Sequence, residues 1–172
     1  MQGRIYNVLF LCTGNSARSI LAEGLMNHWG EGRFKGYSAG SFPKREVNPL
    51  AIDLLSQFAI PTEGMRSKSW DEFAVPGAPT MDFVFTVCDQ AAGELCPIWP
   101  GQPITANWAL SDPAAVEGPL ALKMLAFRQA FALLERRIRA FIGVRLELDR
   151  KIVEAAVREI GRLGRDDEAP KS

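Results

Sequence analysis

The stretch that decides the fold is VLFLCTGNSARS, residues 8–19. An apolar run ends at Cys12, a short polar loop with one glycine follows, and a helical pattern begins at Arg18. We expect a buried strand, then a loop whose backbone N–H groups point inward, then the N-terminus of a helix. Unpaired amides and a helix N-terminus both favour negative charge, so the stretch predicts a cradle for an anion.

Three side chains of this cradle carry chemistry. A helix N-terminus and a nearby cation lower the pKa of a thiol, so Cys12 is expected to be a thiolate. Arg18 offers a planar fork suited to a tetrahedral oxyanion, and Ser19 can donate a hydroxyl hydrogen bond to the sulfur. The alternative is a structural cysteine beside a solvated arginine. The preceding apolar run and the Thr-Gly-Asn-Ser filling favour catalysis.

The loop resembles the phosphate-binding loop of the low-molecular-weight protein tyrosine phosphatases. The form CTGNSxRS is similar to the version carried by arsenate reductases built on that fold. The resemblance implies an oxyanion held by the residues between the cysteine and the helix. These residues are Thr13, Gly14, Asn15, Ser16, Ala17, Arg18 and Ser19.

Length and charge set broader limits. A chain of 172 residues is expected to form one domain with a substantial core. Lys plus Arg equals Asp plus Glu at 20 each, so no net field favours nucleic acid or an acidic membrane. No apolar run approaches the roughly 20 residues that span a bilayer, and the N-terminus lacks signal-peptide architecture. We therefore expect a cytoplasmic enzyme with neither a nucleic-acid nor a membrane partner.

The cysteine count indicates reactive thiols. Cys12, Cys88 and Cys96 are an odd number and a poor disulfide framework. No metal site is expected, because there is no CxxC and His28 is the one histidine. His28 lies about 15 Å beyond Arg18 along the predicted helix, so it cannot serve Cys12 as a base and is expected on the surface.

The remaining pattern alternates strands and helices. Strands are predicted at 6–11, 34–39, 82–87 and 104–108, and helices at 18–29, 48–58, 119–142 and 146–163, with a capping box at 69–72, a loop at 89–102 and a disordered tail at 164–172. Such alternation predicts an α/β fold, an open four-stranded parallel sheet with helices on both faces. The resemblance implies the strand order 2-1-3-4, with a family domain at 1–143 and a C-terminal helical extension and tail at 144–172.

That strand order brings the candidate residues to one cleft. Strands 1 and 3 become neighbours, so Cys12 and Cys88 emerge at the same edge about 5 Å apart, within reach of a disulfide. Asp112 follows the fourth strand at this edge. Taken alone, Cys88 fits a buried, inert thiol better than a reactive one, and Asp112 before a proline fits a turn or helix cap as well as a catalytic acid. Cys96 is harder to explain structurally, because a thiol in an exposed loop is open to oxidation.

The resemblance extends from Val8 to about Gly143 and is similar to arsenate reductases coupled to thioredoxin or a related thiol system. It implies that Cys12 is the nucleophile, Arg18 the oxyanion ligand and Asp112 the general acid. Cys88 and Cys96 would then be the redox pair. A disulfide would pass from Cys12–Cys88 to Cys88–Cys96 and be reset by thioredoxin, or by glutaredoxin with glutathione, without a bound cofactor.

One ion site of the relatives is altered here. Some of them bind potassium through residues matching Asn15, Glu23 and Ser38 plus a carboxylate. This chain has Lys68 at the carboxylate position, and its ammonium is expected to take the ion's place.

Two other functions stay open. A tyrosine phosphatase would use Cys12, Arg18 and Asp112 and leave the other cysteines idle. Such phosphatases usually carry tyrosines where this chain has Ala114 and Ala115. A non-catalytic module that binds oxyanions or senses redox state would use the same cradle without a productive acid.

Overall fold

The computed structural model describes residues 3–88 and 99–164. Cys96, most of the loop predicted at 89–102 and the tail from residue 165 lie outside the described residues. Within the described part, no helix is both long and apolar enough to cross a membrane.

The sheet has four parallel strands: β1 (Tyr6–Leu11), β2 (Phe34–Ala39), β3 (Phe83–Thr86) and β4 (Ile104–Asn107). Their order is β2-β1-β3-β4, which confirms the predicted open parallel sheet and its strand order. The last residue of β1, Leu11, is paired with Ala39 on one side and Thr86 on the other. The strands therefore end together, and the residues that follow them gather at one edge.

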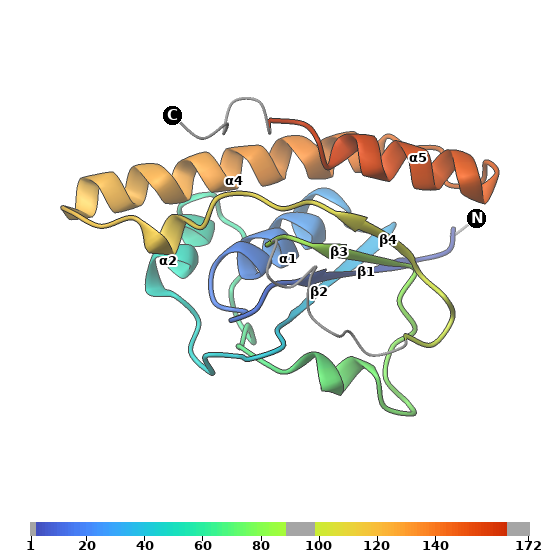
Figure 1. The fold of residues 1–172 in the computed structure, drawn as a ribbon, viewed down its shortest axis with the longest axis horizontal. Coiled ribbons are helices and arrows are strands. Elements are labelled where there is room, and N and C mark those ends of the chain that lie inside the picture. The colour runs from blue at the N-terminus through green and yellow to red at the C-terminus, as the bar shows by residue number, and fades with distance from the viewer. Residues whose placement is uncertain (1–2, 89–98, 165–172) are drawn as a thin grey trace.

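The two faces of the sheet are covered differently (Figure 1). The α-helices are α1 (Arg18–Trp29), α2 (Pro49–Gln57), α4 (Leu120–Ile142) and α5 (Arg150–Ile160). They pack on one face, around Val8 and Phe10 of β1. Leu9 and Leu11 point to the other face, which the short 3₁₀ helix η1 (Trp70–Phe73) covers. The alternation of side chains along β1 thus serves two cores.

The capping box predicted at residues 69–72 is wrong in detail. The Ser69 hydroxyl accepts from the N–H of Asp71, at 3.1 Å, rather than from Glu72. The Glu72 carboxylate instead accepts from the guanidinium of Arg66, at 2.9 Å. This ion pair takes the side chain that a capping box needs, and only a four-residue 3₁₀ helix forms.

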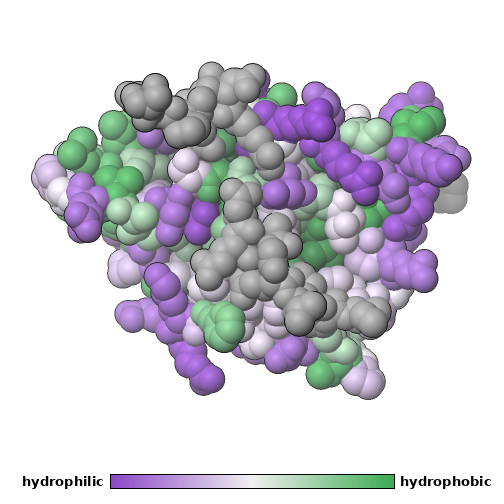
Figure 2. All heavy atoms as spheres, in the orientation of Figure 1, coloured by the Kyte–Doolittle hydropathy of each residue, from purple (hydrophilic) through white to green (hydrophobic). Residues whose placement is uncertain are grey.

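The buried face of α4 begins at Phe127, although the apolar residues of its sequence begin at Leu120. Phe127 and Phe131 are buried, whereas Leu120, Leu122 and Leu125 are at least half exposed. Apolar side chains accordingly gather on the surface at the end of the molecule where α4 begins (Figure 2). A helix of 23 residues spans about 35 Å, whereas the six-residue β1 spans about 20 Å, so the first turns of α4 extend past the sheet.

The helix predicted at 146–163 is the shorter α5, and it belongs to the main core. Val153, Val157 and Ile160 are buried in the cluster that also contains β1 and α4 residues. β4 is an edge strand, and the indole N–H of Trp108, the residue after it, donates to the carbonyl of Val157 at 2.9 Å. α5 therefore covers the end of the sheet. The domain boundary at residue 143 stays a prediction.

Candidate active site

The carbonyl groups of the loop after β1 accept hydrogen bonds from backbone N–H groups of residues 42–48. The N–H of Phe42 donates to the carbonyl of Thr13 at 2.9 Å, that of Lys44 to Gly14 at 3.0 Å and that of Asn48 to Ser16 at 2.9 Å. The amides of residues 15–18 have no hydrogen-bond acceptor within the described part of the chain. Because the carbonyls are used on the outer side, these amides are available to an anion at the helix N-terminus.

Two residues allow the loop to turn. Asn15 adopts the left-handed conformation, with φ of 45°, which asparagine tolerates better than most residues. Its buried amide accepts from the N–H of Lys68 at 2.9 Å and donates to the Ser19 hydroxyl at 2.8 Å. Gly40 allows close approach, because a Cβ there would lie 2.4 Å from the carbonyl oxygen of Thr13. The sequence pattern predicted the loop but not this dependence on Gly40.

The loop forms one wall of a cavity of about 240 Å³. Cys12 lines the cavity, and the lining is completed from outside the loop by Phe42, Lys44, Asp112 and Ala114. No sequence signal pointed to the first two of these residues. They reach the cavity because the segment from residue 40 to 44 pairs with the loop backbone.

Arg18 and Asp112 lie side by side in the lining of this cavity. One guanidinium nitrogen of Arg18 donates to the carbonyl of Leu110 at 3.0 Å, and another lies 3.6 Å from Oδ2 of Asp112. Oδ1 of Asp112 accepts from the N–H of Ala114 at 2.9 Å. Asp112 is therefore a helix cap through one oxygen, while its other oxygen is turned to the arginine. A role as a helix cap is therefore compatible with the predicted role of Asp112 as a general acid.

The second thiol lies directly beside the first. Cys12 and Cys88 are buried free cysteines that follow the neighbouring strands β1 and β3. The backbone N–H of Thr13 donates to Sγ of Cys88 at 3.3 Å, and the Thr13 hydroxyl lies 3.6 Å from the same sulfur. The first amide of the loop is thus directed to Cys88 and not into the cavity. Cys12 and Cys88 therefore lie close together, as expected from the strand order.

The pKa of Cys12 is shifted in the direction opposite to the one expected. The hydrogen bond with Cys88 and burial raise the pKa of the Cys12 thiol, while Arg18 and the N–H of Gly14 act to lower it. A low-pKa thiolate was predicted from the loop alone, which does not contain the second thiol. Two adjacent buried thiols resist carrying two charges, so the pair holds one negative charge at most.

The role expected for Ser19 is also corrected. Its buried hydroxyl is the acceptor of the bond from Asn15, and within the described residues it forms no hydrogen bond with the Cys12 sulfur. The serine therefore acts on the loop through Asn15. His28 is exposed, as predicted.

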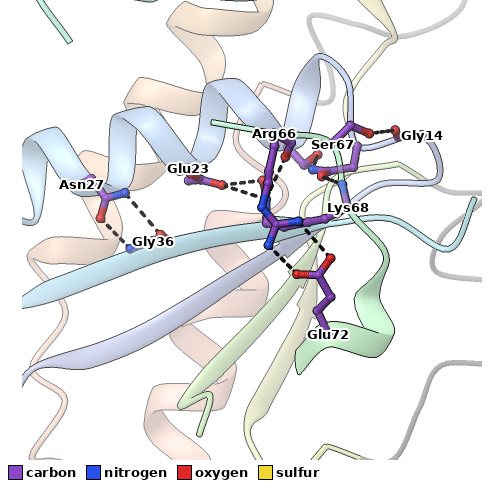
Figure 3. A network of polar contacts seen from close by, with 11 residues as sticks. Gly14, Glu23, Asn27, Gly36, Arg66, Ser67, Lys68 and Glu72 are labelled. Carbon is purple, nitrogen blue, oxygen red and sulfur yellow. Dashed lines mark hydrogen bonds and ion pairs between the residues drawn. The ribbon is translucent and has the colours of Figure 1, made fainter. Parts of the chain in front are cut away.

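A buried lysine supports the loop from behind (Figure 3). The ammonium of Lys68 lies 3.7 Å from Oε1 of Glu23 and donates to the carbonyl of Arg66 at 2.9 Å. The same carboxylate oxygen accepts from the Ser38 hydroxyl at 2.5 Å. The Ser67 hydroxyl donates to the loop carbonyl of Gly14 at 3.1 Å. Burial lowers the pKa of Lys68, and Glu23 opposes that shift.

These contacts place Lys68 next to Glu23 and Ser38, two of the residues expected to mark an ion site. Across the residues that the structure describes, no three His, Cys, Asp or Glu side chains form a group that could hold a metal ion.

The cysteine stands at the end of a parallel strand, and a loop with free amides joins it to the N-terminus of a helix. This arrangement is typical of proteins that bind phosphate-like anions next to a reactive thiol. The chain belongs to the low molecular weight phosphotyrosine protein phosphatase family, which matches residues 7–154. An arsenate reductase of Shouchella clausii is 32% identical over 140 residues, covering 81% of this chain and 91% of that protein.

Two solved structures show the same fold with different activities in their names. One is an arsenate reductase in the phosphate-binding state, with a TM-score of 0.60 and 29% identity, covering 78% of this chain and 97% of that one. The other is a low molecular weight protein tyrosine phosphatase from T. tengcongensis, with a TM-score of 0.60 and 25% identity, covering 78% and 98%. Fold alone therefore does not choose between the two reactions.

Proposed function

We propose that this protein reduces arsenate to arsenite by a relay of thiols that begins at Cys12. The observation that carries the proposal is a second buried free thiol, Cys88, whose sulfur accepts a hydrogen bond from the N–H of Thr13, the residue that follows Cys12. Phosphate transfer needs one thiol, an arginine and an acid. Reduction needs a second thiol within reach of the first, and Cys88 meets that requirement.

The first step is attack on arsenate held by the loop amides and Arg18. The thiolate of Cys12 forms a bond to arsenic as one As–O bond breaks. Protonated Asp112, beside Arg18, gives its proton to the departing oxygen, which leaves as water. Arg18 and the Gly14 N–H favour the thiolate of Cys12, whereas Cys88 and burial oppose it. In the proposal the Cys12 sulfur is the nucleophile because it lines the cavity beside Arg18.

The second step transfers two electrons to arsenic. Cys88, oriented by Thr13, attacks the sulfur of Cys12 and loses its thiol proton. An S–S bond forms, the S–As bond breaks, and its electron pair stays on arsenic, which leaves as arsenite. Cys12 and Cys88 are thereby oxidised to a disulfide, and no bound cofactor takes part.

The last steps restore the enzyme. Cys96, which lies outside the described residues, attacks Cys88 and releases Cys12 as a thiolate. An external thiol, thioredoxin or glutaredoxin with glutathione, then reduces the Cys88–Cys96 disulfide. Such a reductant belongs to a reducing compartment, so we place the protein in the cytoplasm.

Tyrosine phosphatase activity is the second candidate, because Cys12, Arg18 and Asp112 alone can support it. The cavity argues against it as the main reaction. Ala114 lines the cavity at a position where such phosphatases usually carry a tyrosine that stacks on the phosphotyrosine ring, and a methyl group offers no such surface.

The deciding experiment compares two activities in matched variants. Arsenite production is assayed with each purified reductant, and hydrolysis of a small aryl phosphate is assayed in parallel. Cys88→Ser is expected to abolish repeated arsenate turnover and spare the hydrolysis, whereas Cys12→Ser abolishes both. Equal loss of both activities in Cys88→Ser would show that this thiol supports the fold and not the relay. Oxyanion binding without any turnover would instead indicate a binding module.

A further inference from the structure

A buried arginine outside the cavity holds the segment that leads to Asp112. Arg137 of α4 is fully buried. One of its terminal nitrogens donates to the carbonyls of Trp108 at 2.6 Å and Ala109 at 3.2 Å. Its Nε donates to the carbonyl of Leu163, just after α5, at 3.1 Å. A single side chain therefore joins residues 108–112, which we call the acid segment, to the C-terminal part of the chain.

The other end of the acid segment is held by the active-site arginine. Arg18 donates to the carbonyl of Leu110 and lies beside the carboxylate of Asp112. Two guanidinium groups thus bind three consecutive carbonyls, at residues 108, 109 and 110. A planar fork fixes the direction of the peptide groups that it binds, which a point charge does less well.

The C-terminal end of α5 packs closely against the start of the acid segment. A Cβ at Gly161 would lie 2.4 Å from the carbonyl oxygen of Asn107 and 2.8 Å from the indole of Trp108. The same indole donates to the carbonyl of Val157. Backbone and ring therefore meet without space for a side chain. The family match ends at residue 154, so Val157, Gly161 and Leu163 lie beyond it.

We propose that Arg137 and the end of α5 position the proton donor: they hold the acid segment so that the Asp112 carboxyl stays beside Arg18 in the cavity. The proposal rests on the proposed function, in which Asp112 is the general acid. Arg137 touches no reacting atom, so it is a positioning residue. The C-terminal helix would then serve catalysis from outside the region shared with the family.

Stability alone is a poor reason for this arginine. Moving a guanidinium out of water is costly, and an apolar side chain of similar volume is often equally or more stabilising in a core. What an apolar side chain cannot do is bind two successive carbonyls and a third from another segment. The geometry of the acid segment is the property that depends on Arg137.

The first test measures that geometry without any activity. Amide hydrogen exchange is followed in the wild type, Arg137→Lys and Arg137→Met. The reporter is the N–H of Leu110, which donates to the carbonyl of Val87 at 3.3 Å. We expect this amide to exchange about tenfold faster in Arg137→Met, partly restored in Arg137→Lys, with the amides of β1 unchanged. Unchanged exchange at Leu110, or an equal rise throughout the sheet, would overturn the proposal.

The second test asks whether the effect passes through the acid. Arg137→Met is expected to lower kcat for arsenate reduction about tenfold with little change in KM, less than the roughly hundredfold loss from Asp112→Asn. In the Asp112→Asn background, Arg137→Met should cause no further loss. Additive losses would show that Arg137 acts elsewhere.

Two glycine variants test the same contact without changing Arg137: Gly161→Ala disturbs it, and Gly143→Ala is the matched control. Gly161→Ala should repeat the effects of Arg137→Met, because its Cβ meets backbone at 2.4 Å. Gly143→Ala alters a similar helix end, but its Cβ comes no closer than 3.4 Å to any neighbour, and it should behave as the wild type. If the wild type turned over no arsenate, the proposed function would fail while the exchange data still decided whether Arg137 holds the segment. Wild-type behaviour of Gly161→Ala in both assays would contradict the proposal.

Discussion

Among the described residues, Lys68 is the one cation that forms an ion pair with Glu23, next to the loop after β1. Replacing Lys68 by Met would leave the Glu23 carboxylate without this partner. The Lys68 side chain is 9% exposed and that of Glu23 is 15% exposed, so solvent screens the pair poorly. At 3.7 Å and an effective dielectric constant of 20, the Coulomb attraction is about 4 kcal/mol. Removing one partner of a buried pair costs about 3–5 kcal/mol, and the remaining exposure places our expectation near 3 kcal/mol.

The assay is urea unfolding of four proteins: wild type, Lys68→Met, Glu23→Gln and the double variant. The double variant should be more stable than the sum of the two single losses predicts, because neither charge is then left alone. Arg66→Met is the matched control, since its pair with Glu72 is exposed and should contribute less than about 1 kcal/mol. A Lys68→Met loss no larger than that of Arg66→Met would refute the reasoning.

The pH dependence of the same pair has a defined sign. Burial lowers the pKa of Lys68 in the folded protein, so above that pKa the unfolded chain binds more protons than the folded one. The stability difference between the wild type and Lys68→Met should therefore increase as the pH rises toward the ordinary lysine pKa.

A separate prediction concerns potassium. If the Lys68 ammonium takes the place of a potassium ion, potassium chloride should raise the phosphate affinity of Lys68→Ala more than sodium chloride does, and the wild type should not respond.

Two further predictions concern the loop itself. Cys88→Ala removes the largest cause of the raised pKa of Cys12, so iodoacetamide should alkylate Cys12 about tenfold faster at pH 7 than in the wild type, and bound phosphate should protect it. An unchanged rate would mean that burial and not Cys88 controls the thiol. Gly40→Ala should cost about 2 kcal/mol and weaken phosphate binding measured by calorimetry, because its Cβ would meet the Thr13 carbonyl, whereas Gly3→Ala, with open space around it, should have no effect.

The sequence predicted what depends on neighbours in the chain. The strand up to Leu11, the loop and the helix from Arg18 follow from an apolar run, turn residues and helical periodicity within one short stretch. The strand order came from resemblance and was confirmed. It placed Cys12 and Cys88 together, although they are far apart in sequence.

What the sequence could not show depends on distant contacts. The loop pattern predicted a low pKa for Cys12, but the pKa is raised by a thiol from another strand. Leu120 fits the apolar period of α4, yet only the length of the sheet decides where burial begins. Arg137 stands in a run of charged residues in the sequence of α4, and its burial against Trp108 depends on how α4, β4 and α5 pack together.

The central claim is tested most directly by locating the disulfide after one turnover. One equivalent of arsenate is added to the fully reduced protein without an external reductant, and peptides are mapped by mass spectrometry. We expect a Cys88–Cys96 disulfide in the wild type and a Cys12–Cys88 disulfide in Cys96→Ser. A reduced protein with all three thiols free, or Cys12–Cys96 as the main product, would contradict it.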